Sequence, residues 1–168
     1  GEMNLEKVFV HAFTDGRDCD PKSGSYFIHD IQEHMKKTTG ELATVTGRYY
    51  AMDRDKRWER VKLAYDALVN GIGENSTNAL ESIQKSYENN ITDEFIKPII
   101  MIDENGNPKA TIKEDDVVIF FNFRTDRGRQ LTEVLSQKDD NLLEMKKQSL
   151  YFVTLTNYDK TFKNIKVI

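Results

Sequence analysis

The hydrophobic residues of this 168-residue chain follow two spacings that alternate along it. Short continuous runs rich in β-branched and aromatic residues predict strands, whereas apolar residues three or four positions apart predict helices. The runs that predict strands lie at 7–13, 42–46, 97–102, 115–123 and 149–156. The run 115–123, with the sequence DDVVIFFNF, is the longest of them and predicts a buried strand.

Helical spacing fills most of the segments between these runs. The predicted helices lie at 25–38, 53–70, 77–89 and 126–137. For the second helix we expect an N-cap at Asp53 or Asp55 and an end at Gly71. Thr125 or Asp126 would open the last helix.

The order of these elements indicates the fold class. The pair Asn105–Gly106 in DENGNP predicts a hairpin turn, with a returning strand at 109–112. Elsewhere strands alternate with helices, which is typical of an α/β domain. We therefore expect one domain over 1–168, with a three-layer α/β/α fold. Its central sheet of about five strands would be mixed but mostly parallel.

Composition excludes several classes of function. The net charge is −4, and domains that bind nucleic acid are usually basic, so we expect no nucleic-acid partner. The longest apolar runs are too short to cross a bilayer, which excludes a membrane-spanning protein. The chain has a single cysteine, Cys19, which cannot form an internal disulfide and fits a reducing cytoplasm.

The arginines are confined to three short segments, whereas the lysines are scattered. The segments contain Arg17, the group from Arg48 to Arg60, and the group from Arg124 to Arg129. Each follows a predicted strand, and ligands of open α/β sheets bind outside the carboxyl ends of the strands. Because the planar guanidinium suits bidentate binding of carboxylate or phosphate, these segments predict an anion site.

Two less specific interpretations stay open for these residues. Neighbouring carboxylates could neutralise the arginines in surface ion pairs, which contribute little to stability. Asp18, which directly follows Arg17, could face a bound hydroxyl, but the local sequence favours an Asx turn or a cap before Pro21. Asp126 could either orient Arg124 and its neighbours or cap the helix.

Metal binding has little support in the sequence, and we expect no metal ligand in this chain. His11 lies within a predicted strand, where a packed or hydrogen-bonded ring is the simpler interpretation. His29 and His34 are five residues apart, which does not place them on one face of a helix. The aromatic residues Trp58, Phe120, Phe121 and Phe123 lie on apolar faces, so we assign them to the core rather than to base stacking.

Four long segments resemble the cofactor-independent phosphoglycerate mutases. They are VFVHAFTDGRDCDPKSG at 8–24, LATVTGRYYAMDRDKRWERVKLAYDALVNG at 42–71, TDEFIKP at 92–98 and DDVVIFFNFRTDRGRQLT at 115–132. They match the substrate-binding, or phosphotransferase, domain that is inserted in the family's catalytic domain. The chain departs from the family's common residues at Cys19, Thr125 and Gly128, and a glycine in the first helical turn would loosen that helix slightly.

The resemblance implies a function and a set of site residues. The family interconverts 3-phosphoglycerate and 2-phosphoglycerate in glycolysis and gluconeogenesis, through a phosphoserine and usually two manganese ions. It implies that Asp18 is a general base or acid at the glycerate hydroxyls, with a pKa lowered by the arginines. The substrate-binding residues that it implies are Arg17, Asp18, Arg48, Arg54, Arg124 and Arg127.

The same resemblance implies what lies outside this chain. No candidate for the nucleophilic serine or for a metal cluster is found, so we expect both on the family's catalytic domain, and we expect the chain alone to be inactive. Its expected partners are the two phosphoglycerates and that catalytic domain, with no membrane contact and a monomeric state. The alternative is a non-catalytic α/β module that binds an anionic metabolite or a protein.

Overall fold

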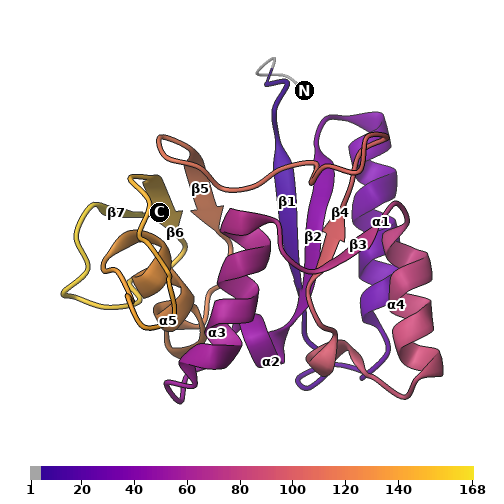
Figure 1. Ribbon diagram of the computed structural model, residues 1–168, viewed down its shortest axis with the longest axis horizontal. Coiled ribbons are helices and arrows are strands. Elements are labelled where there is room, and N and C mark those ends of the chain that lie inside the picture. Colours follow the sequence, from indigo (N-terminus) through magenta and orange to yellow (C-terminus); the bar gives the residue numbers. More distant parts are fainter. Residues whose placement is uncertain (1–4) are drawn as a thin grey trace.

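The computed structural model describes residues 5–168, in which strands and helices alternate along the chain (Figure 1). The strands are β1 (Phe9–Thr14), β2 (Glu41–Gly47), β3 (Glu74–Ser76), β4 (Ile99–Met101), β5 (Val117–Phe120), β6 (Tyr151–Thr154) and β7 (Ile165–Val167). The helices are α1 (Gly24–Lys37), α2 (Arg48–Ala51), α3 (Trp58–Tyr65), α4 (Ala79–Glu88) and α5 (Thr125–Ser136). A π-helical turn, η1 (Asp66–Asn70), continues α3, and a short 3₁₀ turn, η2 (Asp93–Phe95), precedes β4.

The strands form two sheets, so the α/β class is confirmed but the single sheet of about five strands is wrong. The first sheet has the order β1-β2-β4-β3 and is mixed, because β2 and β4 are antiparallel. The second has the order β5-β6-β7 and is entirely parallel. Strand pairing joins segments far apart in sequence, and the local pattern does not state which edges meet.

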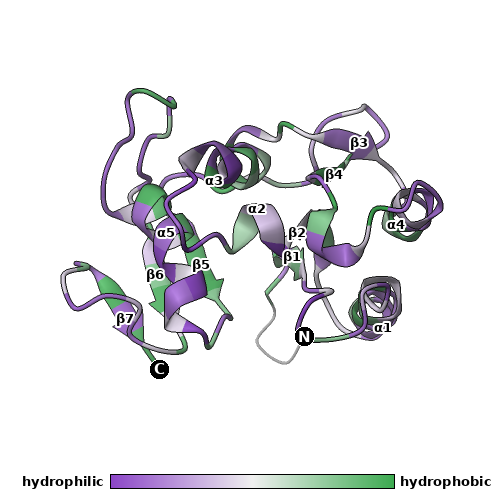
Figure 2. Cartoon of the chain, turned by 90° about the horizontal axis from the view of Figure 1, so that it is seen from below, coloured by the Kyte–Doolittle hydropathy of each residue, from purple (hydrophilic) through white to green (hydrophobic). Residues whose placement is uncertain are grey.

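Helices cover the two sheets unequally (Figure 2). On one face of the first sheet, Ile28 of α1 and Ile83 of α4 pack against Val45 and Ile99. A second core, between α3, α5 and the β5–β7 sheet, includes Leu131 and Phe152. None of the helices in residues 5–168 is long and apolar enough to cross a membrane.

The ends of the helices follow the predictions in part. Gly71 ends the α3–η1 segment with φ of 64°, a left-handed conformation that glycine adopts without strain. The predicted N-cap of α3 is wrong, because the helix begins after Arg57 and has no side-chain cap. α5 begins at Thr125, one of the two residues predicted to open it, and also has no side-chain cap. Asp53 accepts instead from the backbone N–H of Asp55, at 2.9 Å, and of Arg57, at 3.0 Å, before the helix begins.

Two predicted strands differ from the structure. The segment 109–112 forms no strand, and only one antiparallel bridge, between Ile102 and Pro108, closes the turn at Gly106. β5 is shorter than predicted, and one of its faces is exposed rather than buried. The exposed side chains are Val117, Ile119, and, beyond the end of the strand, Phe121 and Phe123. Phe120, which points to the opposite face, is buried, so the core assignment is confirmed there and wrong for Phe121 and Phe123.

Candidate functional site

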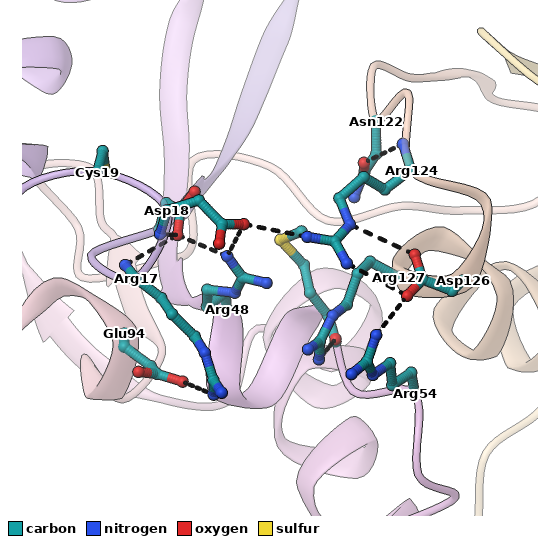
Figure 3. Close-up of polar contacts among 12 residues, drawn as sticks. Arg17, Asp18, Cys19, Arg48, Arg54, Glu94, Asn122, Arg124, Asp126 and Arg127 are labelled. Carbon is teal, nitrogen blue, oxygen red and sulfur yellow. Dashed lines mark hydrogen bonds and ion pairs between the residues drawn. The ribbon is translucent and has the colours of Figure 1, made fainter.

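The three arginine segments meet at the carboxyl ends of β1, β2 and β5 (Figure 3). The loop after β1 contains Arg17 and Asp18, and α2 begins at Arg48 directly after β2. The segment after β5 leads through Arg124 into α5. Because β1 and β2 are parallel, their carboxyl ends lie at one edge of the sheet, as the sequence predicted.

Arg48 is the buried centre of this region, with a side chain that is 2% exposed. Its Nη1 donates to Asp15 at 2.6 Å and to Asp18 at 2.8 Å. Burial alone lowers the pKa of Arg48, but the hydrogen bonds to Asp18 and Asp15 outweigh burial and raise it. Asp15 rather than Asp18 makes the Asx turn, since its Oδ1 accepts from the backbone N–H of Arg17 and Asp18 at 3.0 Å each.

Asp18 therefore has a different environment from the one that its local sequence favoured. Its Oδ2 accepts from Arg48 and, at 3.1 Å, from Nη1 of Arg124. The hydrogen bond from Arg48 lowers the pKa of Asp18, so the carboxylate is ionised at neutral pH. The side chain is 55% exposed and can accept a further partner from solvent.

Asp126 orients two arginines, the role predicted as the alternative to a helix cap. Its Oδ2 lies 2.8 Å from Nη1 of Arg54 and 3.3 Å from Nη2 of Arg124. The hydrogen bond from Arg54 lowers the pKa of Asp126 to about 2, with a further contribution from Arg124. The surface ion pairs expected as the less specific interpretation thus exist, and they hold these guanidinium groups in place.

Arg127 is the least neutralised of the site arginines. Its Nη1 donates to the carbonyl oxygen of Met52 at 2.9 Å, while its buried Nε has no hydrogen-bond partner within residues 5–168. Burial lowers the pKa of Arg127, and the charges of Arg48, Arg54 and Arg124 lower it further. A guanidinium held among other cations is stabilised by a bound anion, which would supply the missing negative charge.

A cavity of about 320 Å³ lies between these segments. Six arginines line it: Arg17, Arg48, Arg54, Arg57, Arg60 and Arg127. Arg124 does not line the cavity but contacts Asp18 and Asp126 beside it. The volume suits a small ligand, and the donors suit one that carries carboxylate or phosphate oxygens.

The sequence reasoning missed Arg57 and Arg60 as part of this lining. Arg57 Nη1 lies 2.5 Å from Asp55 and 3.7 Å from Asp53, and Arg60 stacks over the ring of Tyr49 at 3.7 Å from its centroid. The run GRYYAMDRDKRWERV, which already pointed to Arg48 and Arg54, contains both residues. This run is the sequence signal by which Arg57 and Arg60 could have been assigned to the site.

Asp93 was also missed, although it holds the loop that carries Arg17 and Asp18. It is fully buried, and its Oδ2 accepts from the backbone N–H of Gly24 at 2.7 Å. Its backbone oxygen accepts from the hydroxyl of Thr14 at 2.8 Å. A Cβ at Gly16, which has φ of 65°, would lie 2.7 Å from the Cβ of Asp93, so this turn requires glycine.

The remaining candidate residues have structural environments. His11 Nδ1 lies 2.9 Å from Thr44 Oγ1, and burial lowers the pKa of His11 to about 4, which confirms the packed, hydrogen-bonded interpretation. Cys19 is an exposed free thiol. Within residues 5–168, no group of three or more His, Cys, Asp or Glu side chains is arranged to hold a metal ion.

Comparison with known proteins shows which family this chain resembles. Residues 1–160 match the model of a family described as BPG-independent PGAM N-terminus (iPGM_N). The chain is 63% identical over 167 residues to the 2,3-bisphosphoglycerate-independent phosphoglycerate mutase of Flavobacterium johnsoniae, and 66% identical over 166 residues to that of Flavobacterium psychrophilum. Both alignments cover 99% of this chain and 33% of the relative, so the chain spans about a third of the length of these curated relatives.

A solved structure supports the same relationship. The fold is similar to that of Leishmania mexicana phosphoglycerate mutase, crystallised at low cobalt concentration, with a TM-score of 0.87 and 27% sequence identity. The similarity covers 95% of this chain and 31% of that one.

Proposed function

The chain belongs to the family of BPG-independent phosphoglycerate mutases, and on that premise we propose that it is the substrate-binding part of such an enzyme. The proposed substrates are 2-phosphoglycerate and 3-phosphoglycerate, interconverted in glycolysis and gluconeogenesis. Both carry a carboxylate and a phosphate, the two groups that guanidinium forks bind best. A cytoplasmic location and a monomeric state belong to the same proposal.

The observation that carries this proposal is the convergence of guanidinium groups from distant segments on one small cavity. Arg17, Arg48, Arg54 and Arg127 line it together, and Arg48 and Arg127 keep most of their side chains out of solvent. Such donors hold a ligand in one orientation and stabilise negative charge that develops during phosphoryl transfer. Arg124 reaches the same region through Asp18.

Asp18 is the proposed proton acceptor at the glycerate hydroxyls. Its lowered pKa keeps it ionised, and the hydrogen bonds from Arg48 and Arg124 fix its carboxylate between these two arginines. A positioned carboxylate can take the proton of a hydroxyl that is about to receive the phosphoryl group and can return it afterwards. The exposed side of Asp18 is where that hydroxyl would lie.

The rest of the chemistry is assigned to other parts of the longer enzyme. We propose that 1–168 acts as one substrate-binding unit, and that the phosphorylated serine and two manganese ions belong to the family's catalytic domain. The described residues of this chain do not fit a metal ion, since no suitable cluster of ligands lies among residues 5–168. The proposed role of these residues is to bind the substrate, to orient it and to transfer a proton.

An NMR titration of the chain with 3-phosphoglycerate tests the proposal. We expect the amides of Arg17, Arg48, Arg54 and Arg124 to shift together at millimolar ligand. Arg127→Gln should weaken binding by about 10-fold or more, because a hydrogen bond to a charged group contributes on the order of 1.5–3 kcal/mol. If these amides do not shift at about 10 mM ligand, a concentration well above a Kd of about 1 mM, the assignment is refuted.

Arg129→Gln is the matched control for this titration. Arg129 lies on the same helix as Arg127, but its Nε donates to the carbonyl oxygen of Tyr158 at 3.0 Å, and it does not line the cavity. Its replacement should leave the affinity unchanged. Equal losses in the two variants would indicate a general effect of charge rather than a specific contact.

A further inference from the structure

Arg60 is a cavity-lining arginine whose guanidinium donors have no close acceptor. Its side chain is 28% exposed, and its Nη1 lies 3.8 Å from Oδ1 of Asp53, which is too far for a hydrogen bond. Asp53 is its one carboxylate partner within residues 5–168. That carboxylate has other partners, because its Oδ2 accepts from the backbone N–H of Asp55 and of Arg57. The guanidinium of Arg60 therefore keeps its N–H groups available for a ligand.

An aromatic ring fixes the plane of this guanidinium. The central carbon of the Arg60 guanidinium lies over the ring of Tyr49, 3.7 Å from the ring centroid. The ring of Phe95 packs against Tyr49 in turn, with centroids 5.0 Å apart, and all three residues line the cavity. Because the donors of a guanidinium lie in its plane, stacking on a ring orients the group and leaves its N–H edge free.

The turn η2 supports both this stack and the arginine of the β1 loop. Helix α2, which contains Tyr49, contacts α3 and η2, and Phe95 belongs to η2. The neighbouring residue Glu94 lies 3.3 Å from Nη1 of Arg17. One turn thus positions two guanidinium groups that line the same cavity, Arg17 through an ion pair and Arg60 through aromatic contacts. The aromatic contacts orient Arg60 without neutralising its charge.

We propose that Arg60 is a further ligand-binding residue of this cavity, that it donates to the phosphate group of the ligand, and that Tyr49 is the residue that positions it. The inference rests on the proposed function, since the phosphate is that of a phosphoglycerate. Six arginines and three carboxylates line the cavity, so positive charge is in excess. A carboxylate offers two acceptor oxygens, whereas a phosphate monoester offers three and carries more charge. Arg60 therefore favours phosphorylated over unphosphorylated glycerate.

The Nε–H resonance of Arg60, assigned by its loss in Arg60→Lys, reports on this contact in the 168-residue chain. The probes are inorganic phosphate and glycerate, which carries a carboxylate alone. We expect phosphate to shift the resonance at about 10 mM, a concentration well above a Kd of about 1 mM, and glycerate to leave it unchanged. If phosphate does not shift it, or if glycerate shifts it equally, the proposal is overturned.

Substitution of Arg60 measures its contribution to affinity. Arg60→Gln should weaken the binding of 3-phosphoglycerate by about 10-fold or more and leave the affinity for glycerate unchanged, because the lost hydrogen bond is to a charged phosphate. Lys56→Gln is the charge-matched control, since Lys56 is exposed in the same segment and does not line the cavity. Equal losses in the two variants would contradict a specific contact.

The role of the ring is tested at Tyr49. Tyr49→Leu removes the stacked surface and should weaken the binding of 3-phosphoglycerate by about 3-fold or more, whereas the conservative variant Tyr49→Phe should restore it. Equal affinities of these two variants would refute the positioning role. Arg60→Lys keeps both the ring and the charge but loses the planar fork, so it should also bind more weakly. Wild-type affinity in Arg60→Lys would refute the role of the fork.

The results separate this inference from the proposed function. Wild-type affinity of Arg60→Gln for 3-phosphoglycerate, together with a loss in Arg127→Gln, would overturn the inference and leave the proposed function in place. A shift of the Arg60 resonance with inorganic phosphate, in a chain that does not bind 3-phosphoglycerate, would refute the proposed function. Arg60 would then belong to a site for phosphate alone.

Discussion

The carboxylate of Asp18 accepts a hydrogen bond from Nη1 of Arg124 at 3.1 Å, across 106 positions of sequence. This contact joins the loop after β1 to the segment after β5, so it links the two sheets at the end where the arginine cluster lies. The site is therefore built between the sheets. Its geometry depends on how the sheets are held together as much as on either loop.

A double-mutant cycle with Asp18→Asn and Arg124→Gln measures what this contact contributes to the folded chain. Both side chains are substantially exposed, so solvent screens the pair, and we expect the two substitutions to have nearly additive effects on the free energy of unfolding. Urea denaturation of the four proteins measures these effects. Clearly non-additive effects would show that the pair holds the sheets together, rather than placing charges for a ligand.

Asp18→Asn in a full-length enzyme that contains this chain tests the proposed proton transfer. Loss of a positioned general base lowers rates by about 10²–10⁴-fold, so we expect kcat to fall in that range with a much smaller change in KM. Asp20→Asn is the control, because Asp20 lies in the same loop and accepts only from the backbone N–H of Lys22 and, through its carbonyl, from Ser23. If Asp18→Asn retains about a tenth of the wild-type kcat or more, Asp18 is not the general base.

Asp126 predicts a pH dependence of stability. Its pKa is about 2 in the folded chain, below the ordinary value of 3.8, because Arg54 and Arg124 favour the charged form. The stabilisation is therefore fully present above about pH 4 and is lost as the pH falls to about 2. The side chain is 37% exposed, so after screening we expect a contribution of about 1 kcal/mol.

Asp126→Asn should remove this contribution at pH 7 and flatten the stability curve between pH 4 and pH 2. Thermal unfolding at several pH values measures both effects. Parallel curves for the variant and the wild type over that interval would show that other carboxylates account for the acid sensitivity.

Gly128→Ala should destabilise the chain although alanine favours helices. A Cβ at this position in α5 would lie 2.6 Å from ring carbons of Tyr158, whose hydroxyl donates to the carbonyl oxygens of Asn122 and Phe120 and so fixes the ring. Overpacking costs about 1–3 kcal/mol, against a gain in helix propensity of about 1 kcal/mol. We expect a net loss of about 1 kcal/mol in urea unfolding.

The double variant Gly128→Ala with Tyr158→Leu is the check on this mechanism. Removal of the ring should relieve the overlap, so the two substitutions should destabilise less together than the sum of their separate effects. A single Gly128→Ala variant more stable than the wild type would show that the glycine only loosens the helix, as its sequence position suggested.

Local sequence rules predicted several elements closely. The helix expected at 25–38 is α1 at Gly24–Lys37, and Gly71 ends the α3–η1 segment as predicted. The short strands β3 and β7 were missed, because three residues carry no usable periodicity and are extended only through pairing with β4 and β6. The predicted cap of α3 was wrong for a related reason, since Asp53 accepts from turn amides before the helix begins.

The candidate site, like the fold, could be predicted from the sequence only in part. The arginine segments could be placed at strand ends from the sequence, because a strand followed by a loop is a local pattern. The partners of each guanidinium could not, because Arg54 meets Asp126 across 72 positions and Arg48 meets Asp18 across 30. Asp93 could not be identified from the sequence, because its contacts with Gly24 and Thr14 form only in the folded chain.

By itself, the sequence determined the α/β alternation, the principal helices and the supply of arginines, because helix and strand differ in a period that any short window displays. The tertiary structure alone decided that Arg48 is neutralised while Arg127 is not, and that one face of β5 stays open. Charge compensation and burial depend on which distant surfaces meet. That is a property of the whole packed chain, and no local window contains it.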